Sequence, residues 1–286
     1  MTETIIYLGP EGSYTEIAAE KIAGILGYEG VKTKIETSII KVIESIDKHN
    51  GQIGVVPIEN SIEGIVRETV DNLLKTTSRV TISQEVIIPI SHCLISKSGD
   101  ISKINKIMSI PQALAQCQHY IVKNFNDMEL IPVSSTSEAV RQLKELPENY
   151  AAIGNNKAAE LYNLNILARE INDEKDNQTR FVAIGSDTPK PTGNDKTSIA
   201  ISLCNQAGSL VNVLLAFKEN NINLSYIESR PSKRIFGEYT FFIDFDGHIE
   251  DENVQRTLGK ITPYVNFYRF LGSYPKCPSR IAAAEA

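Results

Sequence analysis

The chain has 286 residues, of which 42% are hydrophobic and 22% are charged, and its formal net charge is −6. This length is typical of two or three domains with their own cores, and the composition is that of a globular protein that folds in water. The negative balance argues against nucleic acid as the main partner, but a local cluster of hydrogen-bond donors can still bind an anionic substrate.

The sequence has no features of a targeting signal, a membrane span or a metal site. Residues 1–11 lack the basic and apolar stretches of a secretory leader, and no apolar run reaches the roughly 18 residues that span a bilayer. The histidines are scattered, and the cysteines, Cys93, Cys117, Cys204 and Cys277, form no C-x-x-C pair. We expect a cytoplasmic protein with no membrane partner, reduced thiols and no metal, in which Cys93 and Cys117 are buried.

The first two thirds of the chain alternate short apolar runs with helical patterns. Strands are predicted at 4–8, 53–56, 80–88, 92–95, 150–154 and 180–185. Helices are predicted at 15–26, 39–46, 66–74, 111–125 and 139–146. This alternation indicates an α/β architecture with largely parallel sheets.

The composition changes at residues 186–196, where two prolines, a glycine and several charges predict a linker. The elements predicted after it are a strand at 197–203, a helix at 208–220, strands at 224–229 and 238–244, a helix at 254–261 and a strand at 265–271. This βαββαβ order is that of a ferredoxin-like unit. The tail, 276–286, has no strand pattern and is expected to fray.

Four segments rich in small or polar residues follow strands and open helices. They are the first turn with Gly12 and Ser13, the segment Glu59–Ser61 with Asn60, the segment Ser109–Gln116, and the cluster of Ser135, Thr136 and Ser137. Each is explained either as a turn or helix cap or as a site whose backbone N–H groups hold an anion. Together they suggest a cleft that suits a substrate with two carboxylates, at the carboxyl ends of the strands. None completes a phosphate-loop motif, which disfavours a nucleotide-dependent enzyme.

Two later segments carry hydroxyl and guanidinium groups beside apolar runs. Asn177–Phe181 places Thr179 and Arg180 where a loop enters a predicted strand, and Glu228–Pro231 places a carboxylate, a hydroxyl and a guanidinium at the end of another. With the four junctions, these segments resemble prephenate dehydratases over about Ile5 to Tyr274.

The resemblance implies a bilobal, periplasmic-binding-protein-like α/β catalytic region followed by an ACT domain. The two lobes are expected at about 1–77 plus 168–185 and at 78–167, and the ferredoxin-like ACT domain at 197–275. The implied reaction converts prephenate to phenylpyruvate with loss of water and CO2, and needs no cofactor. No helical segment like a chorismate mutase precedes the strand at 4–8, so a monofunctional enzyme is expected.

The resemblance also implies roles for individual residues. Thr179 is the key catalytic hydroxyl, and Asn60, Ser109 and Gln116 orient the substrate and donate hydrogen bonds. The expected substrate-binding residues are Gly12, Ser13, Glu59, Ser61, Thr136, Ser137, Arg180 and Phe181, of which Arg180 is mainly structural. Glu59 is either a general acid, if burial raises its pKa, or an ion-pair partner. Ile110 stands where the family usually has His, which puts any essential role of that His in doubt.

For the C-terminal unit the resemblance implies L-phenylalanine as an effector and a homodimer or homotetramer. The expected effector-binding residues are Gly208, Ser209, Leu210, Val211, Asn223, Leu224, Glu228, Ser229, Arg230 and Pro231. Two other functions stay open at this point. One is arogenate dehydratase, in which the substrate carries an amine, and the other is a non-catalytic amino-acid sensor, since both regions are binding folds.

Overall fold

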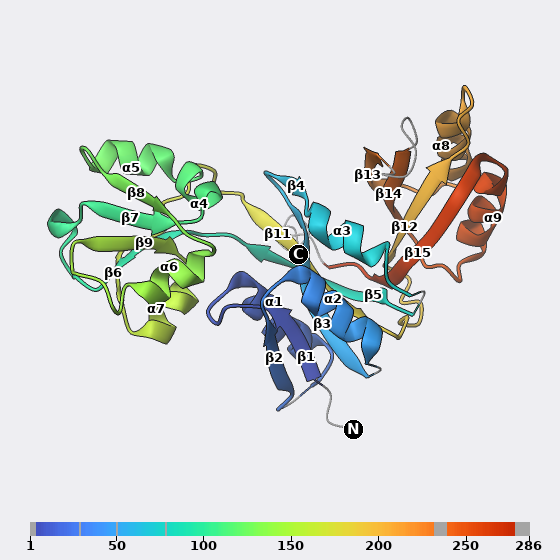
Figure 1. Cartoon of the computed structure of the whole chain (residues 1–286). Helices are drawn as coiled ribbons and strands as arrows, with labels where there is room; N and C mark the ends of the chain where they lie inside the picture. Colours follow the sequence, from blue (N-terminus) through green and yellow to red (C-terminus); the bar gives the residue numbers. More distant parts are fainter. Residues whose placement is uncertain (1–3, 29, 50, 78, 232–238, 278–286) are drawn as a thin grey trace.

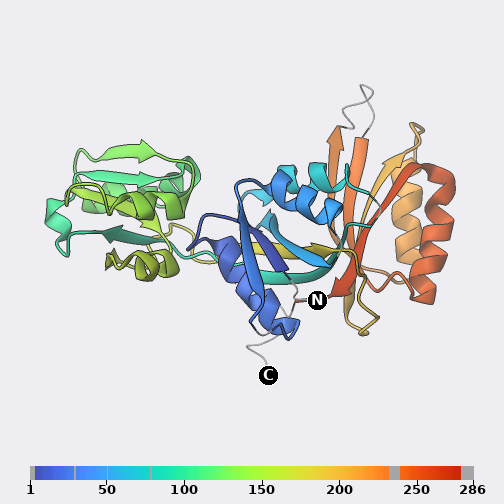
Figure 2. The ribbon, with the colours of Figure 1, turned by 60° about the horizontal axis from the view of Figure 1, so that its bottom comes forward.

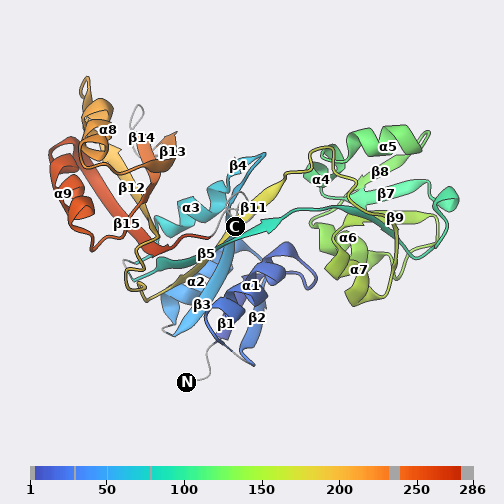
Figure 3. The same cartoon turned by 180° about the vertical axis from the view of Figure 1, so that it is seen from behind.

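The structure is a computed structural model that describes residues 4–28, 30–49, 51–77, 79–231 and 239–277. Its strands form three sheets. Figure 1 shows them in a row, with the first sheet in the middle, the second (green) at one end and the C-terminal sheet (orange to red) at the other. Figure 3 shows the same order from behind.

The first sheet is built around strands β3 and β11. In pairing order its strands are β2 (Lys32–Glu36), β1 (Thr4–Leu8), β3 (Gln52–Asn60), β11 (Gln178–Gly185) and β5 (Thr81–Pro89), with the short β4 (Gly64–Ile65) beside β3. Helix α1 (Tyr14–Ile25) packs on one face, and α2 (Ile39–Lys48) and α3 (Arg67–Leu73) pack on the other. In α2 the buried residues Ile39, Val42, Ile43 and Ile46 recur at helical spacing, which is why this segment forms an amphipathic helix.

The second sheet is covered by helices on both faces. In pairing order its strands are β10 (Asn165–Ala168), β6 (Cys93–Ser96), β9 (Tyr150–Gly154), β7 (Lys106–Ser109) and β8 (Glu129–Pro132). One face packs against α4 (Pro111–Ala115) and α5 (Gln118–Asn124), the other against α6 (Thr136–Gln142) and α7 (Asn156–Tyr162), and a short 3-10 turn, η1 (Ile101–Lys103), precedes β7. Cys93 and Cys117 are buried here, as predicted.

The prediction of largely parallel sheets is wrong, because the first two sheets each contain both parallel and antiparallel strand pairs. β1 runs parallel to β2 and β3, but β11 runs antiparallel to both β3 and β5. In the second sheet β7 is parallel to its neighbours, whereas β6 is antiparallel to β9 and β10. The chain leaves the first sheet through β5 and returns through β11, so these two strands lie side by side in opposite directions.

This crossing also corrects the predicted lobe boundary. Residues 78–167 were expected to form the second lobe, but β5 belongs to the first sheet. An apolar run shows that a strand is buried but does not show which sheet takes it. The predicted helix at 111–125 is likewise two helices, α4 and α5, because the chain breaks at Gln116 and Cys117. There the backbone N–H of Asp173 donates to the carbonyl of Gln116 at 2.8 Å.

The C-terminal sheet confirms the predicted ferredoxin-like order. Its strands pair as β13 (Leu224–Pro231), β14 (Tyr239–Asp246), β12 (Asp195–Leu203) and β15 (Val265–Pro275), all antiparallel. Helices α8 (Ser209–Glu219) and α9 (Glu252–Ile261), followed by the 3-10 turn η2 (Thr262–Tyr264), cover its outer face (Figure 2). On its inner face Ala200, Phe242, Leu271 and Tyr274 join the core formed by α2, α3 and the first sheet. The C-terminal sheet is therefore packed onto the first sheet by shared core residues.

The ends of the predicted C-terminal unit differ in detail. β12 begins at Asp195, inside the predicted linker, and Glu238, where a strand was predicted to start, lies outside the described residues. The first two residues of the predicted tail are held. Lys276 N donates to the carbonyl of Asn194 at 3.0 Å, and Cys277 N donates to Glu85 at 3.0 Å. Residues 278–286 lie outside the described part. No helix that the structure describes is long and apolar enough to cross a membrane.

At Gly272 the backbone of the C-terminal sheet lies close to the backbone of the first sheet. Its φ is +145°, and a Cβ added there would lie 2.7 Å from the backbone nitrogen of Ile82 in β5. Gly272→Ala should therefore lower the free energy of unfolding by about 1–3 kcal/mol, because neither backbone can move without breaking its sheet. Gly259→Ala, in α9 with open space around it, should instead raise it by about 0.5–1 kcal/mol. Equal effects of the two variants in chemical denaturation would contradict this packing.

Candidate active site

A cavity of about 150 Å³ lies between the first and second lobes. Its wall comes from the start of α1, from β3 and β11, from the crossings between the lobes, from α4 and from the start of α6. The lining residues are Tyr14, Asn60, Ile90, His92, Ile110, Gln112, Ala113, Gln116, Thr136, Asn177, Thr179 and Phe181. Of the residues predicted for the site, the structure thus brings together Asn60, Gln116, Thr136, Thr179 and Phe181.

The two-residue repeat of strand β11 decides which side chains reach this cavity. Successive side chains of a strand point to opposite faces. Thr179 and Phe181 face the cavity, whereas Arg180 between them faces the C-terminal sheet. The register pairs Thr179 with Asn60 and Arg180 with Glu59 across β3. The same alternation therefore puts Asn60 on the cavity side and Glu59 on the opposite side.

The orientation of the Asn60 amide is fixed by the backbone. Its Oδ1 accepts hydrogen bonds from the N–H groups of Ile62 and Glu63 at 3.0 and 3.1 Å. Its Nδ2 must then be the group that faces Thr179 Oγ1 at 2.9 Å and Asn177 Oδ1 at 2.8 Å. Since Thr179 Oγ1 accepts this hydrogen bond, the proton of its own hydroxyl is directed to another acceptor, and the cavity lies beside it.

A second set of amides continues from Asn177 into the other lobe. Asn177 Nδ2 donates to Gln116 Oε1 at 3.3 Å, and His92 Nε2 lies 3.2 Å from the same oxygen. Because Gln116 Oε1 is an acceptor, His92 must carry its proton on Nε2. Burial lowers the pKa of His92, against a smaller opposing effect of Gln116, so the imidazole is neutral at pH 7.

This arrangement leaves two buried polar atoms in the cavity wall without a partner among the described residues. They are Gln116 Nε2, which is a donor, and His92 Nδ1, which is then an acceptor. A buried polar atom left without a hydrogen bond costs about 1–3 kcal/mol, so native structures rarely keep one that no ligand or water satisfies. Both atoms are therefore suited to contact a polar ligand.

Several residues predicted for the site lie elsewhere. Ser109 was expected to orient the substrate, but it is fully buried and its hydroxyl donates to the carbonyl of Ile153 at 2.8 Å. Ser13 caps α1 by accepting from Glu16 N, and the carbonyl of Gly12 accepts from Asn155 Nδ2 of the second lobe at 2.8 Å. Ser61 Oγ accepts from Gln178 N, and Ser137 is buried beside the cavity wall without lining it. These groups shape the loops around the cavity.

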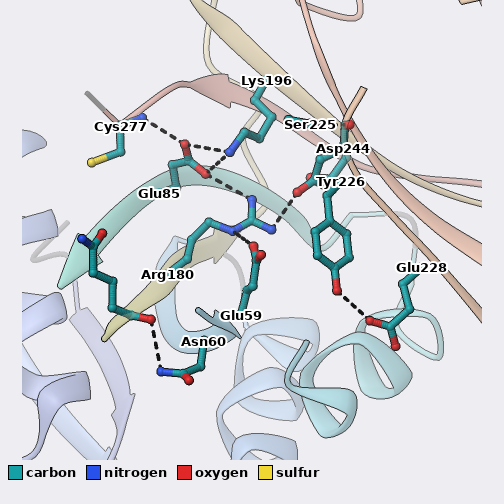
Figure 4. A network of polar contacts seen from close by, with 12 residues as sticks. Glu59, Asn60, Glu85, Arg180, Lys196, Ser225, Tyr226, Glu228, Asp244 and Cys277 are labelled. Atoms are coloured by element: carbon teal, nitrogen blue, oxygen red, sulfur yellow. Dashed lines mark hydrogen bonds and ion pairs between the residues drawn. The ribbon is translucent and has the colours of Figure 1, made fainter. Parts of the chain in front are cut away.

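Arg180 was predicted to bind substrate but does not line the cavity, and of the two roles predicted for Glu59 the structure favours the ion-pair partner over the general acid. Glu59 pairs with Arg180 Nε at 3.0 Å on the face that points away from the cavity. Figure 4 shows the guanidinium of Arg180 among Glu59, Glu85 and Asp244. Burial opposes the charge of Arg180, but Asp244, with smaller effects of Tyr274, Glu85 and Glu59, raises its pKa well above the usual range. Arg180 is therefore a permanently charged structural residue, as the resemblance implied.

The residues predicted to bind an effector lie on separate parts of the C-terminal unit. Gly208, with a φ of +89°, caps the start of α8, where Ser209, Leu210 and Val211 form the first turn. Asn223 directly precedes β13, which begins at Leu224, and Glu228 in this strand accepts from the hydroxyl of Tyr226 at 2.6 Å. Ser229 lies between Glu228 and Arg230 on this strand.

Arg230 and Pro231 line a larger cavity of about 430 Å³ between α3 and the inner face of the C-terminal sheet. Its wall is built from Val70, Asp71, Leu74, Phe242 and neighbouring residues, and Arg230 pairs with Asp71 across it at 2.7 Å. Arg230 and Asp71 of this cavity pair with each other, whereas the smaller cavity is lined by Gln116 and His92, whose Nε2 and Nδ1 atoms have no partner among the described residues. We therefore place the chemistry in the smaller one.

Sequence reasoning did not select Tyr14, His92 and Asn177 as cavity residues. The Tyr14 hydroxyl of the first lobe donates to the carbonyl of Ser91 and accepts from its N–H, which ties α1 to the segment between β5 and β6. Asn177 stands two residues before Thr179, so the two-residue repeat could have placed it on the same face. No local signal marks His92, since a histidine before a strand is common.

Residues 5–189 match the family model described as prephenate dehydratase. The chain belongs to the prephenate dehydratase family. The protein is therefore an enzyme of the prephenate dehydratase type.

Similar proteins match over nearly the whole chain. A prephenate dehydratase of Methanocaldococcus jannaschii is 42% identical over 285 residues, which cover 96% of this chain and 99% of that protein. A bifunctional chorismate mutase/prephenate dehydratase of Aquifex aeolicus is 40% identical over 95% of this chain and 73% of its own length. The solved prephenate dehydratase of Arthrobacter aurescens in complex with L-Phe is 32% identical, with a TM-score of 0.86 over 99% of this chain and 96% of that one.

Proposed function

We propose that this prephenate dehydratase family member converts prephenate to phenylpyruvate, with loss of water and CO2, in phenylalanine biosynthesis. The observation that carries the proposal is the Asn60–Thr179 pair. The amide of Asn60 is held as a donor to Thr179 Oγ1, so the Thr179 hydroxyl is left to donate into the inter-lobe cavity.

The reaction needs only a group that assists departure of the ring hydroxyl. The C–O bond breaks as the electrons of the bond to the ring carboxylate form the new ring double bond and CO2 leaves. Negative charge develops on the departing oxygen, and the hydrogen bond from Thr179 strengthens with it, which lowers the barrier. Glu59 is not placed to donate a proton to the departing hydroxide, because it lies on the opposite face of the sheet and is paired with Arg180. The hydroxide therefore takes its proton from solvent and becomes water.

The remaining cavity groups match a dianionic substrate with one hydroxyl. Gln116 Nε2 is a buried donor for an oxygen of the substrate, and His92 Nδ1 is a buried acceptor. The only donor of prephenate is its ring hydroxyl. Ile110 and Phe181 supply apolar walls around the ring. Ile110 stands where the family usually has His, so in this chain an apolar contact replaces that side chain. Asn60, Gln116 and Thr179 are our proposed catalytic residues, with Thr136 and Phe181 in contact with substrate.

Substitution of Thr179 tests this function directly. Thr179→Ala removes the donor and should lower kcat for prephenate by at least ~10²-fold, the lower end of what a positioned proton donor contributes. Thr179→Ser keeps the hydroxyl and should lose less. Phenylpyruvate absorbance measures turnover, and circular dichroism controls for folding. Near-wild-type turnover by folded Thr179→Ala would contradict the assignment, and no turnover of prephenate by the wild-type protein would contradict the function.

We also propose that the C-terminal ferredoxin-like unit is an ACT domain that binds L-phenylalanine and pairs with a second copy. The solved relative that holds L-Phe supports the ligand. The start of α8 at Gly208–Val211 offers backbone N–H groups to a carboxylate. Exposed apolar side chains gather on this unit, with Val211, Leu214 and Leu215 on α8 and Ile227 on β13. A homodimer or homotetramer would cover them.

Phenylalanine should lower turnover of prephenate and raise the midpoint of thermal unfolding. At a concentration 100 times its Kd, a ligand that binds only the folded state adds about 2.7 kcal/mol to the free energy of unfolding. Thermal unfolding with phenylalanine, beside D-phenylalanine as the matched control, measures this gain. If saturating L-phenylalanine changed neither turnover nor the unfolding midpoint, the regulatory proposal would fail.

A further inference from the structure

The face of β11 opposite the cavity carries a buried charge cluster formed by Arg180, Glu59, Glu85, Asp244 and Lys196. The guanidinium of Arg180 meets Asp244 at 2.7 Å, Glu59 at 3.0 Å and Glu85 at 3.2 Å, and Glu85 also meets Lys196 at 2.8 Å. These carboxylates come from three strands, β3, β5 and β14. Figure 4 shows that the contact between Arg180 and Asp244 joins the first sheet to the C-terminal sheet.

Asp244 is held rigidly on the C-terminal side. Its side chain is 1% exposed, and its Oδ1 accepts from Ser198 Oγ of β12 at 2.6 Å. Ser198 Oγ in turn lies 2.7 Å from the hydroxyl of Tyr274, which is fully buried in β15. Asp244, on β14, is thus linked to β12 through Ser198 and, through Ser198 and Tyr274, to the edge strand β15, so its position follows that of the sheet.

Arg180 transmits that position to Thr179 because the two residues share a peptide bond. Thr179 is paired with Asn60 and Arg180 with Glu59 across strands β11 and β3. These are consecutive residue pairs of the two strands, so their side chains lie on opposite faces of the sheet. The register shifts directly after Arg180, so the strand is irregular at this point. We expect a displaced guanidinium to turn the peptide between residues 179 and 180 and so to move Thr179 Oγ1 relative to the cavity. A misplacement of about 1 Å in a reacting group can cost 10²-fold in rate.

We propose that Asp244 of the C-terminal sheet is a positioning residue for Thr179 and acts through the guanidinium of Arg180. This inference rests on the proposed function, since it assigns Thr179 to the reaction. If Asp244 only stabilised the contact between the two sheets, its loss would lower the free energy of unfolding without a specific effect on kcat.

Asp244→Asn and Asp246→Asn make a matched pair of variants. Asp246 lies two residues further along β14 and pairs with Lys276 at 2.6 Å, but it is partly exposed and does not touch Arg180. Asp244→Asn should lower kcat by about ten-fold, within the 5- to 150-fold typical of coupling between sites, and leave KM within about two-fold. Asp246→Asn should leave both unchanged. Unchanged kcat in folded Asp244→Asn would overturn the proposal.

Measuring Asp244→Asn in the Thr179→Ala variant distinguishes an effect on the position of Thr179 from a loss of activity that does not involve Thr179. If Asp244 acts through Thr179, Asp244→Asn should add no further loss once Thr179 is gone. A full ten-fold loss in that background would overturn the proposal. Should Asp244→Asn fail to fold, Ser198→Ala keeps the charge but loosens Asp244, and it should give a smaller loss of kcat in the same direction. An unchanged kcat in Ser198→Ala would then count against the proposal.

A readout that needs no turnover distinguishes this inference from the proposed function. In protein with ¹³C-labelled threonine methyl groups, the signal that vanishes in Thr179→Ala is that of Thr179. Asp244→Asn should shift this signal, and Asp246→Asn should not. A shift in protein that does not turn over prephenate would support positioning while the proposed function fails, and an unshifted signal would overturn positioning whatever the activity.

Discussion

The alternation of strand β11 is the constraint on which the rest of the structure depends. One strand, paired on both sides in the first sheet, presents Thr179 to the inter-lobe cavity and Arg180 to the C-terminal sheet. The cavity face can then carry neutral hydrogen-bonding groups, while the opposite face carries the buried charges. A single residue step separates the two because side chains of a strand have a period of two.

Strand β11, together with its neighbour β5, also links the first sheet to the other two sheets. β5 leaves the first sheet toward the second, and β11 returns from it. The C-terminal sheet contacts β5 through Gly272 and Lys196, and it contacts β11 through the ion pair of Asp244 with Arg180. The two lobes meet again across the cavity through Asn155 and Gly12. A change in how the C-terminal sheet packs against β5 and β11 therefore acts on the strand that carries Thr179 to the cavity.

Sequence reasoning found the parts of the site that local patterns encode. Asn60, Gln116 and Thr179 stand where strands meet loops or helices, and each reaches the cavity. It failed for Ser109, because its partner, the carbonyl of Ile153, comes from a distant segment. For Glu59 it left an ion-pair role open but could not name the partner, Arg180, which is also distant in the sequence. The edge strands β2 and β8 were missed because their exposed residues show no apolar pattern. Asp244 has no local signal at all, since only the packing of two sheets brings it to Arg180.

The most direct test of the account is the turnover of prephenate by Asn60→Asp. The aspartate keeps the acceptor that Ile62 and Glu63 need, but it replaces the donor to Thr179 by a second acceptor. The Thr179 hydroxyl would then donate to the carboxylate and no longer to the substrate. We expect kcat to fall by at least ~10²-fold in a protein that unfolds like the wild type. Turnover close to that of the wild type would contradict the claim that Asn60 directs the Thr179 proton into the cavity.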